Sequence, residues 1–223
     1  METSLHRQLK ALYAAGDAQL EVPLDDFRID VIADGRLVEI QHGKLAAIRD
    51  KIGRLLERHQ VTVVKPLIVR KTLVRLDGPG GRVVSQRLSP RRSRPLDLFH
   101  ELVYFTRVFP HPRLTLEAPL VEIEERRYPG HGRRRRWRRS DHEIEDQQLI
   151  AVERTIRLVD RHDLLSLIPG SLPLRFDSAA IAQIASVPRW VAQRVVYCLR
   201  KMGATREVGK VGNTRQYAIR GFE

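Results

Sequence analysis

Cysteine is nearly absent from this chain of 223 residues. The single Cys198 excludes an internal disulfide and leaves no CxxC pair for a structural zinc site. The chain also lacks an apolar run long enough to span a bilayer, and its N-terminus carries no signal-peptide pattern. We therefore expect a cytoplasmic protein with no membrane partner and no small-molecule cofactor.

Acidic residues are also few in comparison with basic residues. There are 27 Asp and Glu against 40 Lys and Arg, which gives a formal net charge of +13 and a pI near 10.6. So basic a chain favours a polyanionic partner, most simply nucleic acid, and a cytoplasmic location on the nucleoid follows from that partner. The length allows one large domain or two small ones, each able to bury a core.

One hairpin-forming stretch carries opposed carboxylates. Asp34-Gly35 lies between two apolar-rich runs and predicts a two-residue type I′ turn, which places Asp30 directly opposite Glu39. Carboxylates that face each other repel, so we expect a cation between them, and oxygen ligands on a sheet suit Mg2+ or Mn2+. The other face of the hairpin is expected to be core, formed by Phe27, Ile29, Val31, Val38 and Ile40.

Asp30 and the run Glu39-Ile40-Gln41 resemble the PD-(D/E)xK nuclease superfamily, in which an Asp on one strand and a Glu-x-Lys on the next bind a catalytic magnesium. Gln41 occupies the Lys position of that motif and Ile29 the Pro position. The resemblance implies a metal-dependent endonuclease in which Asp30 and Glu39 hold the ion. Glu-x-Gln versions occur among restriction enzymes of the superfamily, so Gln41 is kept in the implied catalytic set.

Three further residues enter through the same resemblance. Glu21, on a strand expected at residues 20–24, is implied as a third metal ligand, with a solvated strand carboxylate as the alternative. Lys44 and Arg49, on the helix expected after the hairpin, are both candidates to replace the missing catalytic Lys, and the sequence does not choose between them.

Apolar spacing predicts the elements around the hairpin. A helix at residues 4–15 and the strand at 20–24 precede it, and a helix at 44–59 and a strand at 61–70 follow it. This order, αβββαβ, is that of the superfamily's core. We therefore expect an α/β (α+β) fold, a nuclease-like core with a mixed central sheet flanked by helices.

Basic segments follow the expected core. Residues 78–94 are rich in Gly, Pro, Ser and Arg and predict a loop or hairpin in which Arg91 and Arg92 contact phosphate, with a solvated linker as the alternative. An Arg-rich loop at 128–140 suits a nucleic-acid backbone and contains a Trp that can stack on a base. Its expected contact residues are Arg133, Arg134, Arg135, Arg136, Trp137, Arg138 and Arg139.

The remaining segments set the domain boundary. Residues 96–108 predict a helix, residues 114–124 a strand, and residues 143–158 a returning strand, with a helix as the alternative. Pro and Gly residues just downstream interrupt the pattern. We therefore expect a nuclease-like domain at 1–158 and a second domain at 159–223.

The second domain resembles a winged helix-turn-helix module. Asp177 can cap a helix at 178–185, a Ser-Val-Pro turn leads into a helix at 189–202, and two short strands around a Gly-rich turn have the pattern of a wing. The resemblance implies DNA binding, with protein binding as the alternative for such modules. The implied contacts are Arg189, Gln193, Arg194, Tyr197, Arg200, Lys210 and Arg215.

The whole combination resembles an uncharacterised bacterial family that joins a nuclease-like domain to a C-terminal winged helix. We expect a protein that binds duplex or branched DNA and acts as a magnesium-dependent endonuclease in repair, processing or defence. Two alternatives stay open: a transcriptional regulator whose nuclease fold has lost its chemistry, and a ribosome- or RNA-associated basic protein. The oligomeric state also stays open, a homodimer included.

Overall fold

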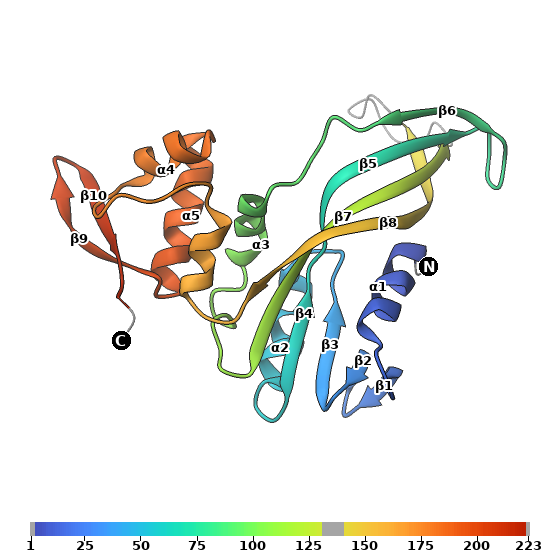
Figure 1. Ribbon diagram of the computed structural model, residues 1–223, viewed down its shortest axis with the longest axis horizontal. Coiled ribbons are helices and arrows are strands. Elements are labelled where there is room, and N and C mark those ends of the chain that lie inside the picture. The colour runs from blue at the N-terminus through green and yellow to red at the C-terminus, as the bar shows by residue number, and fades with distance from the viewer. Residues whose placement is uncertain (1–2, 131–140, 222–223) are drawn as a thin grey trace. The chain divides into compact units, whose positions relative to one another are not determined.

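The computed structural model describes residues 3–130 and 141–221 (Figure 1). The chain is a mixed α+β protein with a large mixed sheet and flanking helices, which confirms the predicted fold class at that level. No helix among the described residues is long and apolar enough to cross a membrane. Contacts divide the chain into unit 1, made of Met1–His42, Val64–Ser93 and Ala118–Ile156, and unit 2, made of Gly43–Val63, Arg94–Glu117 and Arg157–Glu223.

The elements follow one another along the chain in two groups. The first group is α1 (Ser4–Tyr13), β1 (Gln19–Leu24), β2 (Phe27–Ala33), β3 (Arg36–Ile40), the 3-10 turn η1 (Leu45–Ala47), α2 (Arg49–Leu55), β4 (Gln60–Val64), β5 (Leu67–Leu76) and β6 (Val83–Leu88). The second group is η2 (Pro95–Leu98), α3 (Phe99–Leu102), β7 (Leu114–Pro129), β8 (His142–Leu158), η3 (His162–Leu167), α4 (Ser178–Ala185), α5 (Arg189–Lys201), β9 (Thr205–Val211) and β10 (Thr214–Ile219).

The main sheet has the strand order β1-β2-β3-β4-β7-β5-β6, and β8 pairs with β7. Its first three strands form an antiparallel meander, whereas β5 and β7 run parallel. A separate antiparallel pair is formed by β9 and β10.

The predicted hairpin turn is confirmed. Asp34 and Gly35 have φ values of 50° and 71°, as both central residues of a type I′ turn require. The turn pairs Val31 of β2 with Val38 of β3. Both side chains lie in the core of unit 1, as the alternation predicted.

Helix α1 covers one face of this hairpin and contacts both β2 and β3 (Figure 1). Its Leu5 and Leu9 are fully buried, one turn apart on the apolar side of the helix. Each such side chain stabilises the fold by about 1.5–3 kcal/mol relative to exposure. The core cluster of unit 1 is Leu5, Leu9, Val31, Val38, Ile40, Val64, Val121 and Ile123.

Three predicted elements are wrong in extent. The strand expected at 61–70 is divided into β4 and β5, because Pro66 between them has no N–H to give to a strand ladder. The helices expected at 44–59 and 96–108 are replaced by short 3-10 turns and by α2 and α3. Residues 143–158, for which a helix was the alternative, form the strand β8.

In unit 2, the predicted apolar stripe of α5 is confirmed, because Val191, Val195 and Leu199 are buried. Cys198 is also fully buried, with its Sγ 3.9 Å from the carbonyl oxygen of Phe99 in α3. Burial raises the pKa of this thiol to about 12, so the side chain acts as a small apolar residue and not as a nucleophile.

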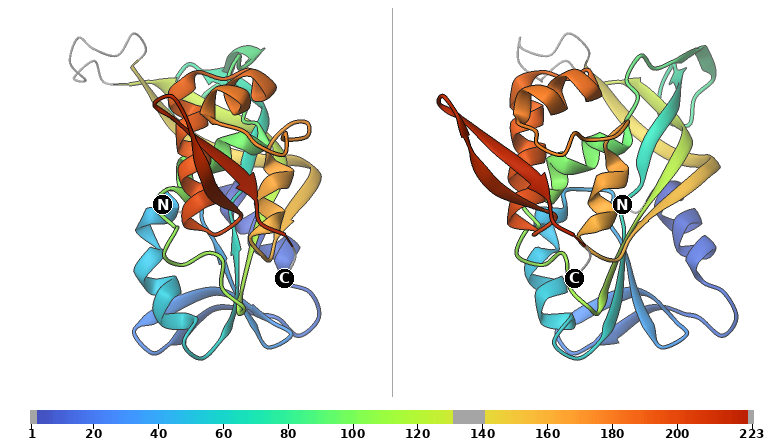
Figure 2. Two further views of the ribbon diagram at one scale, coloured as in Figure 1. Left: turned by 90° about the vertical axis from the view of Figure 1, so that its left-hand side faces the viewer. Right: turned by 60° about the vertical axis from the view of Figure 1, so that its left-hand side comes forward.

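The elements after residue 177 lie in the order helix, turn, longer helix and β-hairpin. Ser186, with φ 49°, turns the chain between α4 and α5. The hairpin of β9 and β10 extends beyond α5 in the right-hand view of Figure 2. Its base is tied back by a bridge between Phe176 and Tyr217, whose rings lie 6.3 Å apart.

Asp177 is expected to stabilise this C-terminal part as the N-cap of α4. Its Oδ1 accepts hydrogen bonds from the backbone N–H groups of Ala180 and Ala179 at 2.9 and 2.7 Å, and these bonds lower the pKa of the carboxyl group. We expect Asp177→Ala to lower the free energy of unfolding by about 1 kcal/mol at pH 7, as measured by urea denaturation. Asp177→Asn keeps the acceptor and serves as the control. A fully stable Asp177→Ala variant would contradict this assignment.

Candidate functional site

The paired register of β2 and β3 ends at Val31 and Val38, just before Asp30 and Glu39, so the predicted opposition of the two carboxylates stays a prediction. The backbone N–H of Ile40 donates to Asp30 Oδ2 at 2.8 Å, so this carboxylate takes the place of a strand carbonyl. Glu39 is only 5% exposed, although the sequence assigned just the opposite face to the core. A carboxylate so deeply buried needs hydrogen bonds or positive charge nearby.

Helix α1 brings basic side chains to the carboxylates of β1 and β2. Nε2 of His6 lies 3.4 Å from Asp30 Oδ1. One turn further on, Lys10 pairs with Glu21, whose Oε2 also lies 2.6 Å from Nε of Arg28. Two cationic side chains, Lys10 and Arg28, therefore lie beside Glu21, the implied third ligand. The imidazole of His6 lies beside Asp30.

His42 follows β3, and Lys65 follows the neighbouring strand β4. Gln41 N donates to the carbonyl of Val64 at 2.8 Å, which holds the chain after β3 against β4. Lys65 is only 7% exposed, and its Nζ donates to the carbonyl of His42 at 2.9 Å. Burial first, and then the positive charges of His6 and Lys65, lower the pKa of His42 from 6.5 to about 4. His42 is thus neutral at pH 7.

We expect this neutral His42 to make the protein less stable as the pH falls from 6.5 towards 4. The unfolded chain binds the proton at the higher pH, so stability is full above about 6.5 and is lost through that interval, by at most about 3 kcal/mol. Urea denaturation of the wild type and of His42→Gln at pH 7.5 and 5 measures the effect. The wild type should lose more stability than His42→Gln, with His59→Gln as a control. Equal losses would contradict the assignment.

The donor atoms of this cluster fit a divalent ion in part. Two ligands of one ion are about 3.0–3.4 Å apart when each bond is close to 2.1 Å, and His6 Nε2 and Asp30 Oδ1 have that separation. Within residues 3–130 and 141–221, however, no group of three or more His, Cys, Asp and Glu side chains is arranged to hold a metal. An ion here would take its other ligands from water or a substrate, as Mg2+ commonly does.

The two candidates for the missing Lys belong to unit 2. Lys44 precedes the 3-10 turn η1 in an extended conformation. Arg49 opens α2 and pairs with the neighbouring Asp50, with Nε 2.8 Å from its Oδ1. The hydrogen bond to Arg49 lowers the pKa of Asp50. Lys65 in unit 1 is a further basic residue of this region, and its Nζ contacts the carbonyl of His42.

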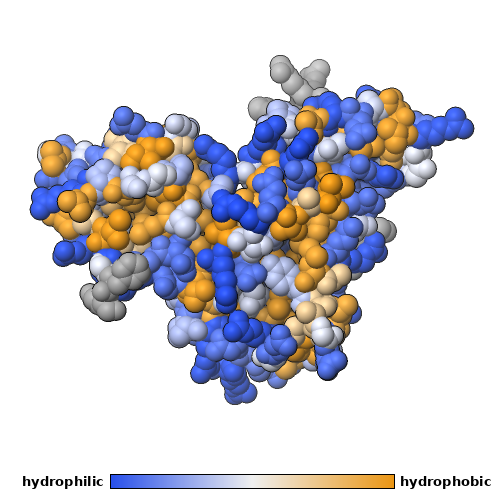
Figure 3. All heavy atoms as spheres, in the orientation of Figure 1, coloured by the Kyte–Doolittle hydropathy of each residue, from blue (hydrophilic) through white to orange (hydrophobic). Residues whose placement is uncertain are grey.

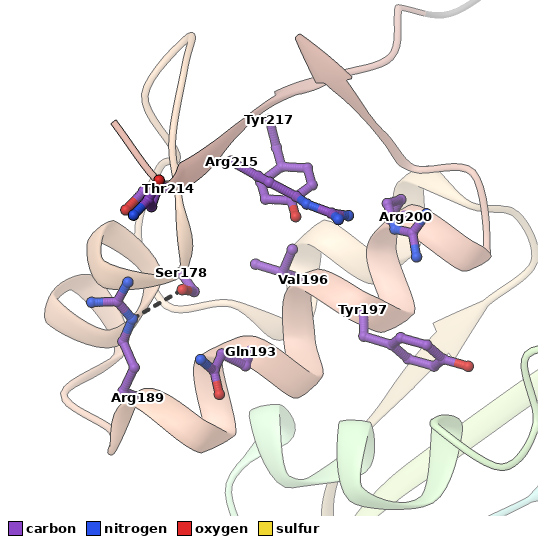
Figure 4. Close-up of a pocket in the computed structure, with 10 residues that line it drawn as sticks. Ser178, Arg189, Gln193, Val196, Tyr197, Arg200, Thr214, Arg215 and Tyr217 are labelled. Carbon is purple, nitrogen blue, oxygen red and sulfur yellow. Dashed lines mark hydrogen bonds between the residues drawn. The ribbon is translucent and has the colours of Figure 1, made fainter. Parts of the chain in front are cut away.

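A second candidate site is a polar groove of about 390 Å3 between α5 and β10 (Figure 4). Three of its lining residues are arginines: Arg189 and Arg200 on α5 and Arg215 on β10. Arg189 Nε donates to Ser178 Oγ at 3.0 Å, and Arg215 lies 3.4 Å from Glu207. The other lining residues are Ser178, Gln193, Val196, Tyr197, Asn213, Thr214 and Tyr217.

The groove combines charge, hydrogen-bond donors and an aromatic face. Figure 4 shows Arg215 projecting from β10 towards α5, with Gln193 and Arg200 on the helix that faces it. Like charges directed into one groove favour an anion, and arginine forks match phosphate oxygens. Figure 3 shows apolar surface on parts of these C-terminal elements. Trp190 of α5 and Val211 of β9 are exposed large side chains.

Some residues predicted to contact DNA lie outside this groove. Arg194 contacts His100 of α3 and stacks on Trp190, with the guanidinium carbon 5.4 Å from the ring centroid. Lys210 is exposed on β9 opposite Arg215. Arg91 and Arg92 are exposed in the segment after β6. The predicted contacts Arg133, Arg134, Arg135, Arg136, Trp137, Arg138 and Arg139 lie outside the described residues.

Sequence reasoning missed several residues of the two sites. His6 and Lys10 are four positions apart on α1 and therefore lie on the same face of the helix. The search for apolar periodicity did not consider these polar residues. Asn213 and Thr214 follow a Gly at the tip of the C-terminal hairpin, a turn signal whose side chains were not assigned a role.

The fold and the two sites define a mixed α+β protein that carries a charged cluster at a hairpin and a groove lined by arginines. The family model described as Domain of unknown function (DUF8091) matches residues 3–159, and the chain belongs to that family. The chain is also similar to an uncharacterised protein of Treponema pallidum (strain Nichols), at 26% identity over 217 residues, which cover 97% of this chain and 84% of that protein. No solved structure matches the chain.

Proposed function

We propose that this protein binds duplex DNA through the groove between α5 and β10. The observation that carries the proposal is the convergence of Arg189, Arg200 and Arg215 on one groove, together with Gln193 and Tyr197. Arginines and hydroxyl or amide donors are the groups that contact phosphates, and a Gln on a helix can read a base edge. The net charge of +13 supports the same partner.

The order of the C-terminal elements supports a winged helix-turn-helix interpretation. The helix α4, the turn at Ser186, the longer helix α5 and the β9–β10 hairpin follow one another as in such modules. On this proposal α5 is the recognition helix and β10 belongs to the wing. The lining residues then lie on the surface that meets DNA.

We further propose that the hairpin of β2 and β3 is the centre of a metal-dependent endonuclease. The order α1, β1, β2, β3, α2, β4, with β1 to β4 as neighbours in the sheet, supports a PD-(D/E)xK-like core. Asp30 and Glu39, which the sequence predicts to lie opposite each other, are the acidic ligands of this proposal. A bound Mg2+ or Mn2+ would polarise the scissile phosphate and lower the pKa of a bound water.

The chain's own residues would divide the remaining work. Asp30 and Glu39 would hold and orient the ion, and the hydrogen bond from Ile40 N fixes the position of Asp30. Lys65, nearly buried beside His42, is the cation we propose for the charge that develops on the phosphate, in place of the Lys that Gln41 replaces.

A second function is favoured by the pairing around β1. Glu21 is occupied by Lys10 and Arg28, and a third acidic ligand is thereby neutralised. That arrangement fits a DNA-binding regulator whose nuclease-like core has lost its chemistry. The two functions share DNA binding and differ in cleavage.

Two assays on the wild-type protein test these proposals. Competition between duplex DNA and duplex RNA at one salt concentration tests the partner, because affinity depends steeply on salt. Binding of RNA as tight as that of DNA would overturn the DNA proposal. Incubation with supercoiled or branched DNA and Mg2+ or Mn2+ tests cleavage. DNA binding with no cleavage under every one of these conditions would overturn the nuclease proposal and support the DNA-binding regulator.

A further inference from the structure

We propose that the DNA held by the groove carries unpaired nucleotides, and that Trp190 and Tyr197 of α5 stack on their bases. The preferred ligand is then a duplex interrupted by unpaired bases and not a fully paired duplex. This inference rests on the proposed DNA binding of the groove between α5 and β10. It adds a second face of α5 to that site and names a class of DNA structure.

Two exposed aromatic side chains on α5 are the first observation. Trp190 is 56% exposed and Tyr197 is 39% exposed, although aromatic rings of this size are largely covered in most folded chains. They are seven positions apart, so they lie on the same side of the helix, about 10 Å apart along its axis. That separation corresponds to about three stacked nucleotides at roughly 3.4 Å each.

Basic residues alternate with the two rings along this side of α5. We call the set the aromatic stripe, and its members are Trp190, Arg194, Tyr197 and Lys201. Spacings of three or four positions place all of them on one helix face. Tyr197 also lines the groove, so the aromatic stripe and the groove are continuous (Figure 4). A strand that leaves the groove would therefore meet positive charge for its phosphates and rings for its bases.

The indole of Trp190 is held in position by its neighbours in unit 2. The guanidinium carbon of Arg194 lies over the ring, 5.4 Å from its centroid, and the ring of His100 in α3 lies 5.7 Å away. Arg194 also contacts Nδ1 of His100, which ties the three side chains together. A ring that is already fixed loses little side-chain entropy when a base stacks on it, so more of the stacking free energy appears as affinity.

The structure of the DNA decides whether the rings can be used. Inside a duplex the flat faces of the bases are covered by the neighbouring base pairs, so a ring can stack only where a base is unpaired. Arginine contacts to phosphates do not make this distinction, and the rings therefore set the preference. Every base has a flat face, so the preference should be for structure and not for sequence.

Fluorescence anisotropy at one salt concentration tests this inference with three labelled ligands. They are a fully paired duplex, the same duplex with three extra unpaired thymines in one strand, and that duplex with abasic units in place of the thymines. We expect the wild type to bind the thymine-containing ligand about tenfold more tightly than the other two. Trp190→Ala should lose this preference and keep the affinity for the paired duplex, whereas Trp190→Phe should retain most of the preference. Tyr104, an aromatic residue outside α5 that is 55% exposed, provides the matched control Tyr104→Ala, which should change none of the three affinities.

Tryptophan emission reports stacking directly. The chain has two tryptophans, Trp137 and Trp190, so the emission of Trp137→Phe comes from Trp190 alone. A base stacked on an indole quenches its emission. We expect the thymine-containing ligand to quench Trp190 and the paired and abasic ligands to quench it much less. Far-UV circular dichroism and a urea curve check that each variant is folded.

Each outcome decides the inference. A preference for unpaired thymines that Trp190→Ala loses supports it. Equal affinity for the three ligands, a preference that the abasic ligand reproduces, or a preference that Trp190→Ala retains would overturn it. In those three cases the paired duplex is still bound, so the proposed DNA binding of the groove stands. Failure to bind any of the three ligands would overturn the proposed DNA binding together with this inference.

Discussion

Replacement of Asp30 by Asn is expected to abolish metal-dependent DNA cleavage, with a loss of roughly a thousandfold or more. The Asn oxygen can still accept the hydrogen bond from Ile40 N, so the hairpin should keep its geometry. What disappears is the negative charge that holds the ion. A metal that polarises the phosphate supplies several kcal/mol, and each 1.36 kcal/mol corresponds to a factor of ten in rate.

The measurement is the initial rate of nicking of supercoiled plasmid at fixed protein and ion concentration. Asp17→Asn, an exposed carboxylate before β1, is the matched control and should retain the wild-type rate. Affinity for uncleaved DNA should be unchanged in Asp30→Asn, because the proposed DNA contacts lie on α5 and β10. If Asp30→Asn nicks plasmid as fast as the wild type, the hairpin is not the catalytic centre.

Removal of the three groove arginines is expected to cause a large loss of DNA affinity. The triple variant Arg189→Ala, Arg200→Ala and Arg215→Ala should weaken duplex binding by roughly a hundredfold or more. The slope of log affinity against log salt should also become shallower by about 2.7, or about 0.9 for each phosphate contact that is lost. Fluorescence anisotropy with a labelled duplex at several salt concentrations measures both quantities.

A charge-matched control separates contact from net charge. The variant Arg54→Ala, Arg58→Ala and Arg154→Ala also removes three exposed arginines, none of which lines the groove. It should change the slope much less. An equal change in both triple variants would mean that DNA is held by the diffuse positive field of the chain and not by the groove between α5 and β10.

The two proposed sites contribute separately, one to DNA cleavage and the other to DNA binding, so the effects of their variants can be compared. Asp30→Asn tests chemistry in unit 1, and the arginine variant tests binding in unit 2. A regulator of the kind favoured by the pairing of Glu21 would respond to the second variant only. A nuclease would respond to both, with loss of rate at saturating DNA only for Asp30→Asn.

The hairpin was predictable because its signals are local. Asp34 and Gly35 fix the turn through their own backbone preferences, and the turn fixes the register of the residues that flank it. The same holds for the buried stripe of α5, which follows from the helical repeat of Val191, Val195 and Leu199. The division of the strand at Pro66 also had a local signal, because proline has no N–H donor. The prediction followed the continuous apolar run and ignored that signal.

Pairing between distant segments was beyond the sequence. His6 and Asp30 are 24 positions apart, and their approach depends on how Leu5 and Leu9 seat α1 on the hairpin. The occupation of Glu21 by Lys10 arises from the same docking. Periodicity identifies the apolar face of such a helix, yet it does not say which polar side chain at the edge of that face meets which carboxylate.

By itself the sequence determined the class of fold, the hairpin and its turn, the two C-terminal helices and the basic character of the chain. Only the tertiary structure decided that Arg189, Arg200 and Arg215 line one groove, that Glu39 and Lys65 are almost buried, and that Asp30 faces His6. The reason is physical. Backbone preferences and apolar repeats act over a few residues and are written in the chain. Burial, charge pairing and the shape of a groove come from packing between segments far apart in it.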